Sequence, residues 1–178
     1  QHTVNTQYAK FGISSVNASL SAGTHYALPF NNQAGLSGEF LSLGTATNPS
    51  STVTVSTEAP AIVEAMWYVM DDITIDRVVW WSGSDANNSG GDVATRAHLL
   101  QYDVVASTTE YSGDLSSMTV LADGSDIANA GYEQAYYQQL TIQSANVDAG
   151  KAIMFAFRYD STTGTDYSVN ATIKYHLR

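Results

Sequence analysis

Residues 61–81 have the sequence Ala-Ile-Val-Glu-Ala-Met-Trp-Tyr-Val-Met-Asp-Asp-Ile-Thr-Ile-Asp-Arg-Val-Val-Trp-Trp, the densest run of β-forming and large apolar residues in the chain. Valine, isoleucine, tyrosine and tryptophan suit a pleated, packed surface, whereas Met70-Asp71-Asp72 interrupts the run with residues that favour turns. The stretch therefore predicts two antiparallel strands joined by a tight turn.

Both arms of this predicted hairpin are apolar on both faces. In the second arm, alternation places Ile73, Ile75, Val79 and Trp81 on one face and Thr74, Asp76, Val78 and Trp80 on the other. A strand covered on both faces lies in the middle of a sandwich or against another subunit. We therefore expect the large aromatic residues of the hairpin to belong to the core or to a subunit interface, and the interface candidates are Trp67, Tyr68, Trp80 and Trp81.

The same hairpin places Glu64 and Arg77 near one another on facing strands. We expect a partly buried salt bridge between them. Such a pair fixes the strand register more reliably than it adds stability.

The remainder of the chain indicates an all-β fold. The clearest alternation is in the last strand, where period-2 spacing over a dozen residues excludes a helix. Its predicted inward side chains are Tyr167, Val169, Ala171, Ile173, Tyr175 and Leu177. Eight to ten strands with loops of uneven length predict a two-sheet antiparallel sandwich, with a jelly roll favoured and an immunoglobulin-like sandwich second.

The chain divides into an extended N-terminal arm, residues 1–22, and a single β-sandwich domain, residues 23–178. The arm has weak alternation and no hydrophobic face of its own, so it is expected to lie on this domain or on a neighbour. A short helix over Ile127 to Gln139 has some support from its alanines, although Gly131 interrupts it.

Composition excludes several classes of partner. The chain has 7 basic and 17 acidic residues among 178, a net charge of −10, so no basic patch is expected to offset the repulsion of a nucleic-acid backbone. The longest apolar run is too short and too interrupted by charge to cross a bilayer. We therefore expect neither a nucleic-acid nor a membrane partner. Only 13% of residues are charged, which is typical of extracellular or virion β proteins.

Candidate metal and cofactor sites are sparse, and no cofactor or metal is expected. The absence of cysteine excludes disulfides, thiolate nucleophiles and cysteine-ligated metals. The loop at Asp85, Asn87 and Asp92 begins like a calcium loop, but Arg96 stands where the bidentate glutamate should be, so an ordinary surface turn is the expected structure. The four histidines, His2, His25, His98 and His176, lack the close spacing of paired metal ligands.

Aromatic content allows a carbohydrate site. Stacking on sugar rings requires exposed rings on a rigid surface, and the chain has 11 tyrosines and 3 tryptophans. The best candidates for glycan contact are Tyr132, Tyr136 and Tyr137, which lie in a loop-rich segment.

Three stretches resemble small structural proteins of tailed bacteriophages, especially marine ones. They are Ile73-Thr-Ile-Asp-Arg-Val-Val-Trp-Trp-Ser-Gly, then Gly113-Asp-Leu with Ala122-Asp-Gly-Ser-Asp-Ile-Ala-Asn-Ala-Gly-Tyr, and Val147-Asp-Ala-Gly-Lys with Asp166-Tyr-Ser-Val-Asn-Ala-Thr-Ile-Lys-Tyr-His-Leu. The resemblance covers about the last two-thirds of the chain. It implies a jelly-roll domain on the exterior of a virion that decorates a capsid or tips a fibre, without catalytic residues.

Three functional hypotheses follow. The first is a non-enzymatic virion component, a capsid decoration or cement protein or a capsid or tail appendage, that forms a homotrimer and binds other virion proteins. The second is a carbohydrate- or receptor-binding module of a fibre tip. The third is a β-sandwich hydrolase, which needs an acid and a base clustered in a cleft.

Overall fold

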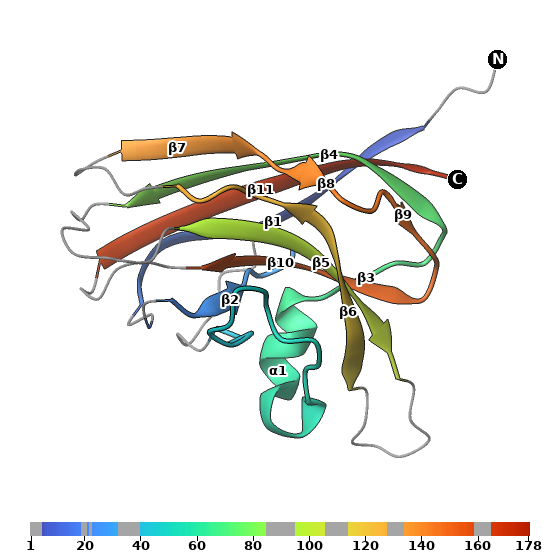
Figure 1. The fold of residues 1–178 in the computed structure, drawn as a ribbon, viewed down its shortest axis with the longest axis horizontal. Coiled ribbons are helices and arrows are strands. Elements are labelled where there is room, and N and C mark those ends of the chain that lie inside the picture. The colour runs from blue at the N-terminus through green and yellow to red at the C-terminus, as the bar shows by residue number, and fades with distance from the viewer. Residues whose placement is uncertain are drawn as a thin grey trace.

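The structure is a computed structural model that describes residues 5–18, 21, 23–31, 40–84, 95–105, 114–127, 134–158 and 165–178. These residues form eleven strands and one helix (Figure 1). In chain order they are β1 Thr6–Ala18, β2 His25–Ala27, α1 Val55–Ala65, β3 Trp67–Tyr68, β4 Ile73–Ser84, β5 Arg96–Val104, β6 Leu115–Asp123, β7 Gln134–Gln139, β8 Thr141–Ile142, β9 Asn146–Val147, β10 Lys151–Arg158 and β11 Thr165–Leu177.

The strands form two antiparallel sheets packed face to face, which confirms the predicted sandwich. Sheet A has the order β1-β11-β4-β7, with β9 beside β4. Sheet B has the order β2-β10-β5-β6-β8, with β3 beside β10. Within the described residues no helix is long and apolar enough to cross a membrane.

The strand pairing is nested in the manner of a jelly roll. Among the eight main strands, the first pairs with the last, β1 with β11, and the second with the seventh, β2 with β10. The third pairs with the sixth, β4 with β7, and the fourth with the fifth, β5 with β6. An immunoglobulin arrangement keeps its first two strands in one sheet, whereas β1 and β2 lie in different sheets. The favoured topology is therefore confirmed.

The predicted hairpin over residues 61–81 is wrong in its first arm. Ala61 to Ala65 is the last part of α1, and β3 pairs with β10 in sheet B, whereas β4 lies in sheet A. The turn at Asp71-Asp72 therefore crosses between the sheets instead of joining neighbouring strands. Alanine-rich sequence favours the helix, and Ile62 and Ala65, three residues apart, bury one face of it.

The predicted salt bridge between Glu64 and Arg77 is also wrong. Glu64 lies on α1, which covers sheet B, and Arg77 lies on the outer side of sheet A (Figure 1). Arg77 instead donates from Nη2 to the Tyr137 hydroxyl at 3.0 Å.

A β-bulge changes which residues of β4 face the core. Opposite β11 the register shifts between the pairs Lys174–Arg77 and Tyr175–Ile75, so Asp76 is an extra residue. The two residues Asp76 and Arg77 are both exposed, and alternation resumes one position later. Trp80 is consequently 1% exposed and Trp81 52% exposed, the reverse of the predicted grouping of Trp81 with Ile73 and Ile75.

The N-terminal segment is part of the sandwich. Thr6–Ala18 forms β1, an edge strand of sheet A that pairs with β11, and Ala9, Phe11 and Ile13 are buried in the core. The predicted arm could lie on this domain or on a neighbour, and its described residues lie on this domain.

Of two predictions for the C-terminal half, one is confirmed and one is wrong. In β11 the predicted inward residues Val169, Ala171 and Ile173 are buried, although Leu177 at its end is 42% exposed. The weakly supported helix over Ile127 to Gln139 is wrong where it is described, because Gln134–Gln139 is strand β7 beside β4.

The strands β5 and β10 of sheet B are buried on both faces. One cluster of apolar side chains fills the space between the sheets and includes Phe11, Trp80 and Phe155. A second cluster lies on the outer side of sheet B, where Ile62 of α1 and Leu41 pack on Met154. Every residue from Ala152 to Phe157 in β10 is therefore buried.

The bulge makes Trp80 and Trp81 a matched pair for a stability test. Trp80→Ala should lower the free energy of unfolding by about 3–5 kcal/mol, because it leaves a cavity in the core. Trp81→Ala should change it by about 0.5 kcal/mol or less, because that indole is at the surface. Urea unfolding of both variants measures the difference. Equal losses would contradict the register of β4 beyond the bulge.

Candidate functional site

The outer side of sheet A carries aromatic and cationic side chains on four hydrogen-bonded strands. Inward residues alternate with outward ones along each strand, so four neighbouring strands present their outward side chains together. Most of these outward residues are exposed, in contrast to the covered outer side of sheet B. We call this surface the aromatic–cationic face, and define it by Tyr8, Lys10, Arg77, Trp81, Tyr137 and Lys174.

An exposed aromatic pair lies on β4 and β7. Trp81 and Tyr137 are opposite one another, with ring centroids 5.0 Å apart and planes at 51°. Their exposed fractions are 52% and 47%. The hydrogen bond that Arg77 donates to the Tyr137 hydroxyl also fixes the position of the tyrosine ring. Large rings with two side-chain torsions each, one of them hydrogen-bonded, offer contact area at low entropic cost.

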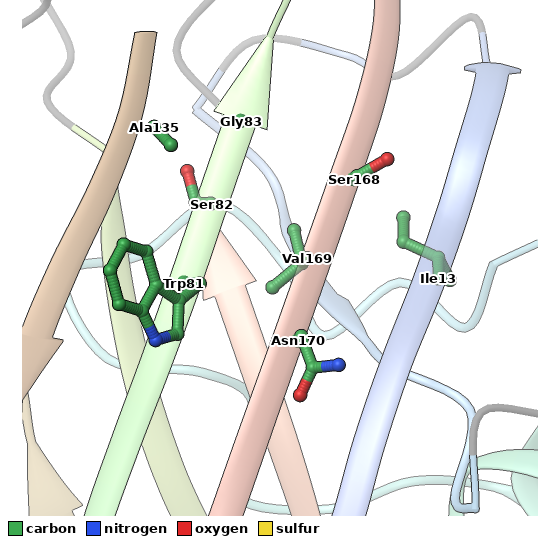
Figure 2. A pocket seen from close by; sticks show the side chains of 8 residues that line it. All are labelled: Ile13, Trp81, Ser82, Gly83, Ala135, Ser168, Val169 and Asn170. Atoms are coloured by element: carbon green, nitrogen blue, oxygen red, sulfur yellow. The ribbon is translucent and has the colours of Figure 1, made fainter.

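A hollow of about 400 Å³ adjoins Trp81 (Figure 2). Gly83 and Ala135 are opposite one another in the next outward row, and their small size leaves the space open beside the indole. Asn170 and Ser168 of β11 line the hollow with polar groups. The hollow therefore combines one aromatic wall with amide and hydroxyl groups.

The cations of this face have no acidic partner among the described residues. Of the seven basic side chains in the chain, Arg96, Lys151, Arg158 and Arg178 each form an ion pair with an aspartate. The other three are Lys10, Arg77 and Lys174, and all three belong to the aromatic–cationic face. Within the described part of this chain of net charge −10, the cations without an ion-pair partner thus lie on one surface.

One end of the sandwich has the opposite character. The turn after β3, the turn before β10 and the end of β11 meet there, since the Gly150 amide donates to Val69 O at 2.8 Å and the Arg178 amide to Asp72 O at 2.9 Å. The exposed side chains at this place are three carboxylates, one guanidinium and several apolar groups. We call this surface the acidic end, and define it by Tyr68, Met70, Asp71, Asp72, Asp148, Leu177 and Arg178.

The predicted interface residues lie in separate places. Trp80 is a core residue, and Trp67 stacks on Phe30 with ring centroids 5.9 Å apart and planes at 2°. Tyr68 belongs to the acidic end and is 46% exposed, and Trp81 belongs to the aromatic–cationic face. Of the four, Tyr68 and Trp81 present the larger exposed surface, and their role as an interface stays a prediction.

The predicted glycan residues also separate. Tyr137 is exposed beside Trp81, and Tyr136 is the preceding, half-buried residue of β7. Tyr132 lies outside the described residues. The candidate calcium loop at Asp85, Asn87 and Asp92 lies outside them as well.

Two histidines that are far apart in sequence meet under the outer cover of sheet B. His25 of β2 and His98 of β5 are both fully buried, with ring centroids 5.1 Å apart. His25 Nδ1 lies 3.2 Å from Gly44 O. His98 Nδ1 lies 3.0 Å from a carboxylate oxygen of Asp123, although their orientation does not meet hydrogen-bond geometry.

Sequence spacing could not reveal this pair, because it depends on β10 lying between β2 and β5. A third metal ligand does not join them. Among the residues that the structure describes, no three histidine, cysteine, aspartate or glutamate side chains form a group able to hold a metal ion. Of the other two histidines, His176 has its Nδ1 2.9 Å from a carboxylate oxygen of Asp76, and His2 lies outside the described residues.

Burial keeps this histidine pair neutral. Loss of solvent lowers the pKa of His98 to about 4, against a smaller opposing effect of the Asp123 carboxylate. Burial also lowers the pKa of His25, and the positive charges of Arg158 and Arg96 act in the same direction. The pair therefore affects the stability of sheet B and does not form a solvent-facing site.

The comparisons with known proteins give only distant likenesses. No protein-family model matches the sequence, and no curated protein matches it. Among solved structures, the chain is similar to a chain of the empty head of turnip yellow mosaic virus, with a TM-score of 0.29 and 7% identity over 99% of this chain and 83% of that chain. It is also similar to a chain of T=1 particles derived from infectious bursal virus, with a TM-score of 0.20 and 8% identity over 99% of this chain and 60% of that one. Likenesses this distant carry no information on function.

The buried histidines predict loss of stability in mild acid. An unfolded chain binds protons on histidine below its ordinary pKa of 6.5, whereas folded His98 binds one only near pH 4. Stability should therefore fall as the pH falls from about 6.5 towards 4, by about 2 kcal/mol between about pH 7 and 5 from His98 alone. Urea unfolding at several pH values measures this slope.

The variant His98→Gln is the matched control for that slope. It should be less stable than the parent at neutral pH but lose less stability between about pH 7 and 5, because glutamine does not titrate. A slope that does not change in the variant would show that His98 is not the titrating group.

Proposed function

We propose that this chain is a non-enzymatic structural component of a tailed-phage virion, a capsid decoration or cement protein or a capsid or tail appendage, located on the particle exterior. It acts by protein–protein assembly as a homotrimer and by binding other virion proteins such as a capsid or fibre protein. The observation that carries the proposal is the exposed aromatic–cationic face on the outer side of sheet A.

The composition of that face fits a protein contact. Tryptophan, tyrosine and arginine are the residues that most often dominate the energy of protein interfaces, and Trp81, Tyr137 and Arg77 lie next to one another on β4 and β7. Each large aromatic ring buries about 150–250 Å² when covered. The strands below them are hydrogen-bonded on both sides in β4 and β11, so the face is already in its binding conformation.

The sequence resemblance supports the tailed-phage assignment. The quoted stretches from Ile73 and from Asp166 form most of β4 and β11, the two central strands of sheet A. The stretch Val147 to Lys151 contributes to the acidic end. These three stretches thus build or flank the proposed contact surfaces.

The location on a particle tests the proposed function directly. Antibody fragments against the chain should decorate intact phage particles at regular positions on the capsid or at a fibre or tail, as seen by cryo-electron microscopy. Particles from a phage that lacks the gene should bind none and should regain them when purified protein is added. Particles that carry no copies of the chain would contradict the proposal.

The assembly state gives a second test. Light scattering at micromolar concentration should give three times the mass of one chain, and Trp81→Ala should shift this species towards monomer by removing a central interface side chain. Val63→Ala on α1 is the matched control, because Val63 is 70% exposed on the opposite side of the sandwich. A parent protein that stays monomeric would count against the homotrimer.

A carbohydrate- or receptor-binding module is the second candidate, favoured by the hollow beside Trp81. Its aromatic wall and polar lining match what a sugar ring requires, and its volume of about 400 Å³ falls in the range of small-ligand sites.

Glycan-array binding distinguishes this candidate from assembly alone. A carbohydrate module should bind defined glycans, and Trp81→Ala and Tyr137→Ala should each weaken that binding by about 5- to 30-fold, because stacking of a sugar on an aromatic ring contributes on the order of 1–2 kcal/mol. Val63→Ala should leave it unchanged. An array without hits would remove this candidate and leave the assembly proposal intact.

A further inference from the structure

We infer that copies of this chain contact one another heterologously, with the aromatic–cationic face of one copy packed on the acidic end of the next. This inference rests on the proposed function, because it assumes that the chain assembles with itself. It specifies which two surfaces meet and why a surface does not meet its own copy.

The cations of the aromatic–cationic face need a negatively charged partner. Lys174 and Arg77 are directly opposite on neighbouring strands, and like charges in that position repel. Lys10 lies on the next strand, opposite Thr172. Asp76, which precedes Arg77 at the bulge, has a carboxylate oxygen that is already 2.9 Å from His176 Nδ1. A partner that supplies carboxylates therefore relieves the repulsion.

Two aromatic–cationic faces do not suit one another. In a two-fold contact each surface meets its own copy, so Lys10, Arg77 and Lys174 would face the same three cations. Opposed like charges at an interface repel one another and slow association. The aromatic groups alone could pack in this way, but the charges exclude it.

The acidic end has the complementary charge. Asp71, Asp72 and Asp148 place three carboxylates there against one guanidinium, Arg178, which lies 2.6 Å from an Asp148 oxygen. The carboxylates are well exposed, with Asp72 and Asp148 side chains 55% and 72% accessible. Their excess over the single cation is available to the cations of another copy.

The acidic end also offers apolar groups to cover the aromatic pair. Met70 is 75% exposed, Tyr68 46% and Leu177 42%. Methionine is flexible and packs well on aromatic rings, so Met70 is suited to Trp81 and Tyr137. Apolar contacts at the centre and opposite charges around them are the usual composition of a specific interface.

The backbone of the acidic end is held in place before any contact. The Ala149 amide donates to the Asp72 carboxylate at 2.9 Å, and Gly150 adopts φ 85°, a conformation that favours glycine. Together with the amide bonds of Gly150 and Arg178, these contacts tie three chain segments together. Little conformational entropy is therefore lost when a partner binds.

A contact between two different surfaces must close into a ring or continue indefinitely. The two surfaces adjoin, since Leu177 of the acidic end pairs with Ile73, four residues from Arg77 along β4. Each copy can therefore use both surfaces on adjoining sides. The homotrimer of the proposed function is a closed ring of this kind.

Charge reversal tests the pairing. The face variant Arg77→Glu/Lys174→Glu and the end variant Asp71→Lys/Asp148→Lys should each weaken association by about tenfold or more. The combined four-substitution variant should regain the trimer, because the swapped charges again attract. Asp72 is left unchanged because its carboxylate holds the Ala149 amide. Light scattering over a concentration series measures each mass, and urea unfolding verifies that each variant is folded.

The outcomes separate this inference from the proposed function. If the parent is trimeric but the combined variant stays monomeric, or if one set of reversals has no effect, the face-to-end contact is overturned and assembly through another surface stands. If the parent is monomeric at every concentration, the homotrimer and this inference fall together. Glycan binding by a monomeric parent that is lost in the face variant would assign the face to the carbohydrate candidate and overturn the inference.

Discussion

The structure depends on the two-sided burial of the antiparallel pair β5–β10 in sheet B. Phe155 and its neighbours in the pair face the space between the sheets, while Met154 and Leu100 face the other way. Apolar side chains on that second side must also be removed from water, since each contributes about 1.5–3 kcal/mol when buried. Helix α1 and residues 40–54 provide that cover. Sheet A has no such requirement, because its outward residues are mostly polar, cationic or aromatic, and it is therefore the sheet that remains open for contact.

Sequence reasoning succeeded where a local pattern determined the structure. In β11 the alternation of small or apolar residues with polar ones specifies a strand with one buried face, and Val169, Ala171 and Ile173 obey it. The pattern does not require knowledge of any partner strand. The two-sheet sandwich could therefore be predicted from a few such strands and the loops between them. A jelly roll was favoured over an immunoglobulin-like arrangement, but which strands pair with one another could not be predicted.

The errors arose where a distant partner determined the structure. Residues 61–65 are largely apolar on both sides, a pattern that a covered strand and a covered helix share, and packing on sheet B adds to the helix propensity of the alanines. Alternation along β4 predicted that Trp81 shares a face with Ile73, but the bulge at Asp76 depends on how β11 pairs with it. One extra residue moved every later side chain to the opposite face. The exposure of Trp81, on which the candidate site depends, was therefore invisible to the local pattern.

The placement of the charged side chains likewise depends on which strands are neighbours. The sequence establishes that cations are few, but not that four of them are matched by aspartates and three are gathered on one face, because Lys10, Arg77 and Lys174 come from three separate strands. In a protein of net charge −10, scattered cations would attract the protein's own acids, and a cluster of them without acidic partners repels itself. Such a cluster is retained at a cost in stability, and the cost is offset when another molecule brings carboxylates to it. The open side of sheet A thus combines the two properties of a docking surface, a face that the fold does not need to cover and a charge that the rest of the chain opposes.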